Sequence, residues 1–208
     1  MNQKYFSIAG AAISWFAVIA QFWLLLLHRT AGLSETIIQF FSYFTILTNI
    51  LVAICFTVCI ANKNSRIKIF FQKPGTLTAI MVYIVIVGLV YQILLRQLWQ
   101  PIGLQMVVNE LLHSFIPPEF IVYWFLYEKK GELQWRMFPY WLIYPLLYAA
   151  YILLRGEVSG FYPYPFINVT DLGWQKTLIN VGGLFVLFIA FSLLFIGVGK
   201  LLNKKGNK

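Results

Sequence analysis

Residues 76–95 read TLTAIMVYIVIVGLVYQILL, a run that contains no Asp, Glu, Lys or Arg. A helix that spans a bilayer needs roughly 20 mostly apolar residues, so this run has the length and composition of a transmembrane helix. Further runs of the same kind fill most of the remaining chain, at 5–27, 36–61, 104–127, 137–154 and 174–198. The pattern predicts an all-α polytopic membrane protein, with one domain (residues 1–208) formed by a bundle of six transmembrane helices.

The composition supports the same class. The 208 residues are 60% hydrophobic and 11% charged, and their mean hydropathy is +0.75, so one soluble core could not bury the apolar surface. Lys4 precedes the first run as it would precede the core of a signal peptide. No A-x-A-type cleavage site follows, and the run is long enough to span, so we expect it to be the first helix.

The distribution of Lys and Arg predicts the orientation. The connections on one side of the predicted bundle hold twelve of the sixteen basic residues, and the positive-inside rule places that side, with the N and C termini, in the cytoplasm. These residues are Lys4, Lys63, Arg66, Lys68, Lys73, Lys129, Lys130, Arg136, Lys200, Lys204, Lys205 and Lys208.

The net charge of +9 is scattered over helix ends and forms no single basic face. We therefore expect contact with anionic lipid and no nucleic-acid partner. Cys55 and Cys59, the only cysteines, lie one helical turn apart, which favours packing over a disulfide framework or a zinc site. We expect neither a metal nor an organic cofactor.

Polar side chains inside a spanning helix are costly in lipid and are therefore candidates for function. At 100° per residue, the polar residues of helices 36–61 and 104–127 fall within arcs of roughly 120° and 100°. Each helix should therefore turn one polar stripe towards the bundle interior. The two stripes consist of Ser42, Thr45, Thr48 and Asn49, and of Asn109, Glu110 and His113.

Thr45 and His113 stand at matching depths in this scheme. Each lies nine residues inside the predicted outer start of its helix, roughly 13 Å below the surface at 1.5 Å per residue. If the two helices are neighbours, the side chains can meet. A neutral histidine can take the hydroxyl proton as the oxygen attacks a carbonyl and return it to the leaving alcohol, which is the logic of nucleophilic ester cleavage.

The same residues also have structural interpretations. Thr45 can bond a carbonyl of its own helix, and His113 can bond a neighbouring helix. Asn49 and Asn109 can link helices or donate to an oxyanion.

The charged residues near the outer surface leave similar alternatives. Glu110 can orient His113 from one turn above or simply meet water near the mouth of the bundle. Arg96 and Arg155 can snorkel to the interface or bind the carboxylate of an acidic lipid.

The loop 155–166 reads RGEVSGFYPYPF. Its two prolines fix backbone angles and remove donors, and its aromatic residues suit the headgroup level. Two interpretations follow: a rigid cap over the outer mouth of the bundle, to which Tyr164 would contribute, or an aromatic belt that only anchors the loop.

Three strings, FSYFTILTN (41–49), LHSFIP (112–117) and GFYPYPF (160–166), resemble the bacterial Pr6Pr membrane proteins. More distantly, the chain is similar to the androgen-induced and androgen-dependent membrane proteins, which hydrolyse fatty acid esters of hydroxy fatty acids with a threonine nucleophile and a histidine. The resemblance implies that Thr45 is the nucleophile, that His113 is the base, and that residues 164–166 match a Tyr-Pro-Phe motif. It also implies a lipid substrate and the bacterial cytoplasmic membrane.

We therefore predict an intramembrane lipid-ester hydrolase with Thr45 and His113 at its centre and Asn49, Asn109, Glu110, Arg155 and Tyr164 in support. A lipid or small-molecule transporter is the alternative, and it predicts broken helices and a polar route through the bundle. A structural protein is the third possibility, in which Thr45 and His113 only hold helices together.

Overall fold

A computed structural model of the chain describes residues 2–61 and 65–206. These residues form helices joined by short connections, without a β-strand among them, which confirms the all-α class. The α-helices are α1 (Gln3–Leu27), α2 (Leu33–Phe41), α3 (Phe44–Ile60), α4 (Arg66–Phe71), α5 (Thr76–Val90), α6 (Gly103–Glu110), α7 (Ile116–Tyr127), α8 (Phe138–Trp141), α9 (Ile143–Ser159) and α10 (Val169–Gly206). Shorter π-helical and 3₁₀-helical segments are η1 (Tyr91–Leu95), η2 (Leu111–Phe115), η3 (Lys130–Glu132), η4 (Trp135–Met137) and η5 (Pro165–Ile167).

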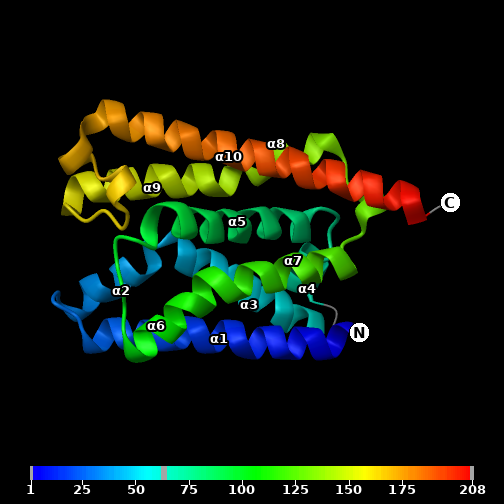
Figure 1. The fold of residues 1–208 in the computed structure, drawn as a ribbon, viewed down its shortest axis with the longest axis horizontal. Helices are drawn as coiled ribbons and strands as arrows, with labels where there is room; N and C mark the ends of the chain where they lie inside the picture. The colour runs from blue at the N-terminus through cyan, green and yellow to red at the C-terminus, as the bar shows by residue number, and fades with distance from the viewer. Residues whose placement is uncertain (1, 62–64, 207–208) are drawn as a thin grey trace.

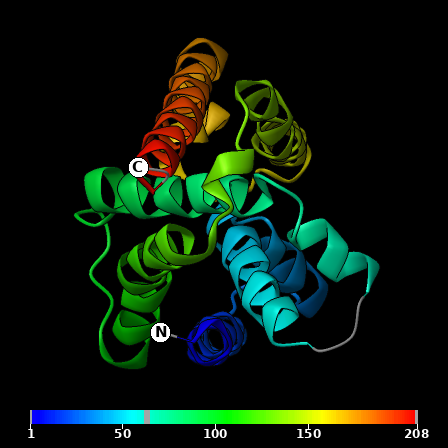
Figure 2. The same cartoon turned by 90° about the vertical axis from the view of Figure 1, so that its right-hand side faces the viewer.

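Helix α5 lies in the middle of the molecule. Figures 1 and 2 show it between α9 and α10 on one side and α1, α3 and α7 on the other. Residues 78–88 are all buried, so the helix is covered around its whole circumference, as expected for a helix without a polar face. The run 76–95, the first indication of the fold in the sequence, therefore forms the centre of the bundle.

Four helical segments are long and apolar enough to cross a membrane: α1, Thr76–Leu95 of α5 and η1, Trp135–Ser159 ending with α9, and Val169–Lys204 of α10. A fifth results if α2 and α3 together form one bent span. The sixth predicted span, 104–127, is an unbroken helical run of α6, η2 and α7. It is less apolar because it carries Glu110, His113 and Glu119, and its crossing of the membrane stays a prediction.

The predicted uninterrupted helix 36–61 is wrong. The chain breaks at Ser42 and Tyr43, and α2 and α3 meet at an angle of 70°. The Ser42 hydroxyl donates to the carbonyl of Ile38 at 2.7 Å, and the Ser42 carbonyl accepts a hydrogen bond from the Tyr148 hydroxyl at 2.8 Å. Tyr43 is extended, with a ψ of 122°. These side-chain bonds replace the helical ladder locally, which is how serine ends helices.

The break changes the position of Thr45. Thr45 is the second residue of α3, not a residue two and a half turns inside a longer helix, so the depth argument from a continuous helix does not hold. Ser42 also leaves the common stripe, because it precedes the bend. The first N–H groups of a helix have no carbonyl partner within it, and Thr45 carries one of them.

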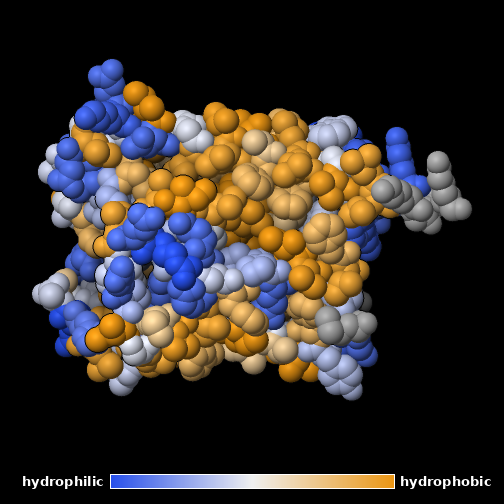
Figure 3. Space-filling model, in the orientation of Figure 1, coloured by the Kyte–Doolittle hydropathy of each residue, from blue (hydrophilic) through white to orange (hydrophobic). Residues whose placement is uncertain are grey.

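The N-terminal end of α1 and the C-terminal end of α10 lie at the same end of the bundle (Figure 1). The connection after α1 and the loop between α9 and α10 lie at the other end. In Figure 3, hydrophobic side chains cover much of the middle of the visible face, and hydrophilic side chains gather towards its ends. Such a surface suits contact with lipid chains.

Candidate active site

His113 lies in a π-helical turn that faces a second π-helical turn. In η2 the N–H of Ile116 donates to the carbonyl of Leu111, five residues back, and in η1 the N–H of Arg96 donates to the carbonyl of Tyr91. Pro117 explains the first turn, because it has no N–H to offer the carbonyl of His113. Such turns are frequent at functional sites, and here they stack the rings of Tyr91 and His113 at 4.2 Å.

Gly88 lets α5 approach the turn that holds His113. A Cβ at Gly88 would lie 3.2 Å from the His113 carbonyl oxygen and 3.2 Å from ring carbons of Pro117. These contacts are tighter than ordinary van der Waals contact, so any larger residue would push the His113 turn away from α5.

Asn109 positions the His113 ring in two ways. Its carbonyl lies 2.9 Å from His113 Nδ1, and its side-chain amide donates to the Tyr91 hydroxyl at 2.6 Å, holding the ring that stacks on His113. A carbonyl can only accept, so in neutral His113 the proton is on Nδ1. The Nε2 lone pair is therefore the basic position of this side chain.

Thr45 is held at the start of α3 by Tyr164 and Asn49. Its N–H donates to the Tyr164 hydroxyl at 3.2 Å, and its own hydroxyl lies 3.4 Å from the same oxygen. Asn49 donates to the Thr45 carbonyl at 2.8 Å and to the Leu112 carbonyl at 3.4 Å, so one amide joins Thr45 to the residue before His113. The helices that carry Thr45 and His113 are thus direct neighbours.

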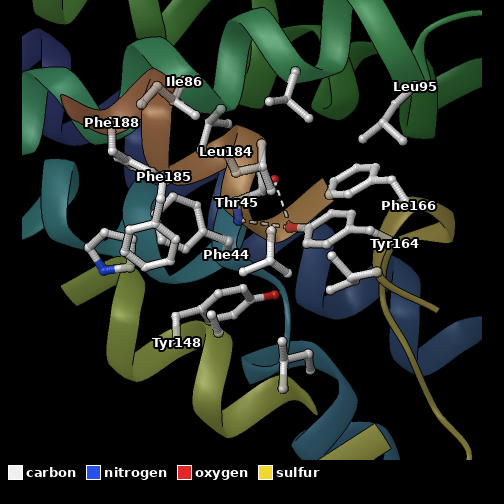
Figure 4. Close-up of a pocket in the computed structure, with 17 residues that line it drawn as sticks. Phe44, Thr45, Ile86, Leu95, Tyr148, Tyr164, Phe166, Leu184, Phe185 and Phe188 are labelled. Atoms are coloured by element: carbon white, nitrogen blue, oxygen red, sulfur yellow. Dashed lines mark hydrogen bonds between the residues drawn. The ribbon is translucent and has the colours of Figure 1, made fainter. Parts of the chain in front are cut away.

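Tyr164 enters the bundle from the loop between α9 and α10. Figure 4 shows its ring pointing at Thr45, with the ring of Phe166 beside it. The two rings stack at 5.2 Å, and Tyr43 packs edge-on against Tyr164 at 5.9 Å. The predicted cap therefore does more than anchor a loop, because it delivers a hydroxyl to the start of α3.

Thr45 and His113 line the same cavity. This cavity, which we call the wide cavity, has a volume of about 460 Å³. Tyr91, Asn109 and Tyr164 also lie on its wall, together with the polar side chains of Gln21, His28 and Gln105. A reacting group of a ligand in this cavity would have a hydroxyl, an imidazole and several amide donors within its walls.

A second, smaller cavity of about 80 Å³ lies on another side of Thr45 and Tyr164. We call it the apolar slot. Figure 4 shows Phe44, Ile86, Leu184 and Phe188 around it. Thr45 and Tyr164 line both cavities, so they form part of the boundary between them.

The charged residues singled out in the sequence form ion pairs and do not line either cavity. Glu110 forms an ion pair with Arg96 at 3.0 Å. Arg155 pairs with Glu35, and its side chain, only 9% exposed, also packs on the ring of Phe161. Neither Glu110 nor Arg155 is among the residues that line the two cavities. Arg155 instead joins α9 to α2.

Three tyrosines of α9 complete the polar region, and the sequence interpretation missed them. Tyr144 lies 3.3 Å from the Thr48 hydroxyl, Tyr148 donates to the Ser42 carbonyl, and Tyr151 lies 3.1 Å from the Ser42 hydroxyl. Their spacing of four and three residues places them on one helix face. That spacing was a usable signal, since three hydroxyls on one face need partners inside a bilayer.

Among residues 2–61 and 65–206, no group of three or more His, Cys, Asp or Glu side chains is arranged to hold a metal ion. Comparison of the chain with family models, with curated proteins and with solved structures finds no match. The resemblance drawn from the three sequence strings therefore stays a prediction, and any function must be argued from the site itself.

Proposed function

We propose that this chain is an intramembrane lipid-ester hydrolase with Thr45 as nucleophile and His113 as general base and acid. The observation that carries the proposal is the wide cavity, which has both side chains on its wall. Asn49 links the two helices by donating to the carbonyls of Thr45 and Leu112. By contrast, the side chain of Thr78 is fully buried and lines neither cavity.

The reaction has two balanced steps. In the first, His113 Nε2 takes the proton of Thr45 as its oxygen attacks the ester carbonyl carbon; the bond to the alcohol oxygen then breaks, and His113 returns the proton to that oxygen. In the second, His113 activates water, which attacks the acyl-threonine, releases the fatty acid and restores the Thr45 hydroxyl. The Asn109 carbonyl, bonded to Nδ1, keeps Nε2 as the position of the His113 ring that takes and returns the proton.

Tyr164 and the start of α3 supply stabilisation of the developing oxyanion. The Tyr164 oxygen accepts the N–H of Thr45 and has only a long 3.4 Å contact with the Thr45 hydroxyl, so its proton can turn to the carbonyl oxygen of a bound ester. The positive end of the α3 dipole acts in the same direction. Donors prepositioned at an oxyanion give about 10²-fold or more in rate each.

The membrane setting of the proposal is six spans with both termini in the cytoplasm of a bacterial cell. One support is the excess of Lys and Arg in the connections on one side of the predicted bundle. The other is that the N-terminal end of α1 and the C-terminal end of α10 lie at the same end of the bundle. The cavities then open in the half of the membrane away from the cytoplasm, and the substrate reaches Thr45 from that leaflet.

The first experiment is labelling of the purified protein in detergent with a fluorophosphonate, which traps activated hydroxyl nucleophiles. We expect labelling of the wild type and loss of labelling in Thr45→Ala and His113→Ala, with folding checked by size-exclusion chromatography. Thr57→Ala, which removes an exposed hydroxyl farther along α3 and outside both cavities, is the control that should keep the label. Unlabelled wild type would sink the hydrolase proposal.

Transport is the second candidate, and the 70° break between α2 and α3 is the observation in its favour, because broken helices often frame transport sites. Against it, the two cavities involve no residue of α3 beyond Ile46, and Ala53, Cys55 and Phe56 farther along that helix are buried. A proteoliposome assay of fluorescent lipid movement decides between them: flux that persists in Thr45→Ala would favour transport.

A further inference from the structure

The two cavities that meet at Thr45 differ in size and in polarity. The wide cavity, at about 460 Å³, carries the amides of Gln21, Gln105 and Asn109, and the apolar slot, at about 80 Å³, carries mainly aromatic and aliphatic side chains. An ester whose carbonyl carbon lies at Thr45 can place one half in each cavity, since Thr45 lines both. The difference between the cavities therefore dictates which half of the ester goes where.

The slot has almost nothing to offer a polar group. Its only hydroxyls belong to Thr45, Tyr148 and Tyr164, and the Tyr148 hydroxyl already donates to the Ser42 carbonyl. A hydrated or charged group would lose its hydrogen bonds to water without replacement, which disfavours its entry. An alkyl chain has no hydrogen bonds to lose, so the apolar wall of the slot favours an alkyl chain over a polar group.

The shape of the slot limits the chain further. Phe185 and Phe188 stand at the end away from Tyr164 in Figure 4, with ring centres 6.4 Å apart, and Phe188 packs edge-on against Phe44 at 5.8 Å. These rings lie at one end of the slot, and its volume of about 80 Å³ suits one chain better than a ring system or two chains side by side. The slot therefore fits a single unbranched chain of limited length.

We propose that the apolar slot is the acyl-chain site of the enzyme, and that the alcohol half of the ester occupies the wide cavity. This inference rests on the proposed hydrolysis and adds the orientation and class of the substrate. The orientation suits the chemistry, because His113, which returns the proton to the leaving alcohol, lines the wide cavity and not the slot. The expected substrates are esters of one straight acyl chain with a larger, partly polar alcohol.

The test is the acyl-chain profile of hydrolysis, measured with a series of 4-nitrophenyl esters from acetyl to palmitoyl. Ala149, on the slot wall, is replaced by Phe to shorten the slot; Ala150→Phe, on the exposed side of the same helix and outside both cavities, is the control. We expect Ala149→Phe to lower the ratio of kcat/KM for the longest ester that the wild type accepts to kcat/KM for the acetyl ester at least tenfold, and Ala150→Phe to leave this ratio as in the wild type. Phe188→Leu should shift the preference to longer chains.

Binding of a fluorescent straight-chain polyene fatty acid gives a readout that needs no catalysis. We expect Ala149→Phe, and not Ala150→Phe, to weaken binding at least tenfold. Identical chain profiles in the two variants, with hydrolysis intact, would overturn the acyl-site inference and leave the hydrolase proposal standing. A wild type that binds the fatty acid in an Ala149-dependent way but cleaves no ester would overturn the hydrolase proposal and retain the slot as a chain-binding site.

Discussion

Thr45 and Thr78 lie at similar positions near the starts of two different helices, and their surroundings differ. Each lies in the first turn of its helix, and each gives its N–H to a side-chain oxygen from another element: Thr45 to Tyr164, and Thr78 to Glu128 at 2.9 Å. Both therefore help to satisfy the free N–H groups that every helix start leaves. At both sites, therefore, a side-chain oxygen from another element accepts a backbone N–H of the first helical turn.

The hydroxyl groups separate the two sites. The Thr78 hydroxyl is fully buried, donates to Glu128 at 2.7 Å and accepts from the Trp124 indole N–H at 2.8 Å. The Thr45 hydroxyl has a long 3.4 Å contact with Tyr164 and borders two cavities. Saturated bonds without space stabilise the fold, whereas a loosely bonded hydroxyl beside a cavity is available for a substrate. The comparison teaches that residue type and helix position alone do not mark a site.

The largest expected effect comes from the isosteric pair Thr45→Val and Thr78→Val. We expect Thr45→Val to reduce ester hydrolysis by about 10³-fold or more, as loss of a nucleophile does, with little change in thermal stability. We expect Thr78→Val to lower stability by about 1–3 kcal/mol, because the Trp124 N–H loses its acceptor, and to retain most of the activity. Activity assays and thermal unfolding of both variants check this, and similar losses of stability in both would break the comparison.

Tyr164→Phe sharpens the contrast at the Thr45 site. The ring packing on Phe166 is kept, and only the hydroxyl that contacts Thr45 is removed. We expect kcat to fall about 10²-fold with a smaller change in KM, because the hydroxyl acts mainly on the charged transition state. Steady-state kinetics over a substrate series measure the two parameters; an effect confined to KM would assign Tyr164 to binding alone.

Gly88→Ala tests how far the site depends on close packing behind it. The added methyl group lies 3.2 Å from the His113 carbonyl and from Pro117, so the His113 turn must move. We expect a fall in kcat of about tenfold, since small displacements of a catalytic group are costly, and a loss of about 1–3 kcal/mol in stability. Gly183→Ala, where an added Cβ meets nothing within 4 Å, is the matched control in α10.

The smallest effect concerns pH and the Thr78 site. Burial raises the pKa of Glu128 above its ordinary value of 4.5, with the bonds from Thr78 opposing the shift. A carboxyl group with a raised pKa in the folded state favours folding when protonated, so its contribution is present at low pH and is lost as the pH rises through the raised pKa. We expect the melting temperature to rise modestly as the pH falls from neutral, and Glu128→Gln to flatten that dependence. Hydrolysis near neutral pH should be the same in both proteins.

Much of the fold follows from hydropathy, and the exceptions are instructive. The runs 5–27 and 76–95 appear as helices close to their expected bounds, and 174–198 lies within the longer α10, because a long apolar run can satisfy its backbone in lipid only as a helix. The break at Ser42 was missed, since the partner that stabilises it, Tyr148, lies more than a hundred residues away.

The sequence alone determined which residues are chemically unusual for a bilayer interior, and Thr45, Asn49, Asn109 and His113 stand out because each carries a polar group that lipid cannot solvate. Tertiary structure decided what those groups do. It joined Thr45 to the helical run of His113 through Asn49, and it directed Tyr164 at Thr45 from the loop between α9 and α10. It also paired Glu110 with Arg96 and Arg155 with Glu35. The reason is physical: the cost of burying a polar group is local, but the partner that removes the cost, or the cavity that leaves it exposed to a substrate, depends on how distant helices pack.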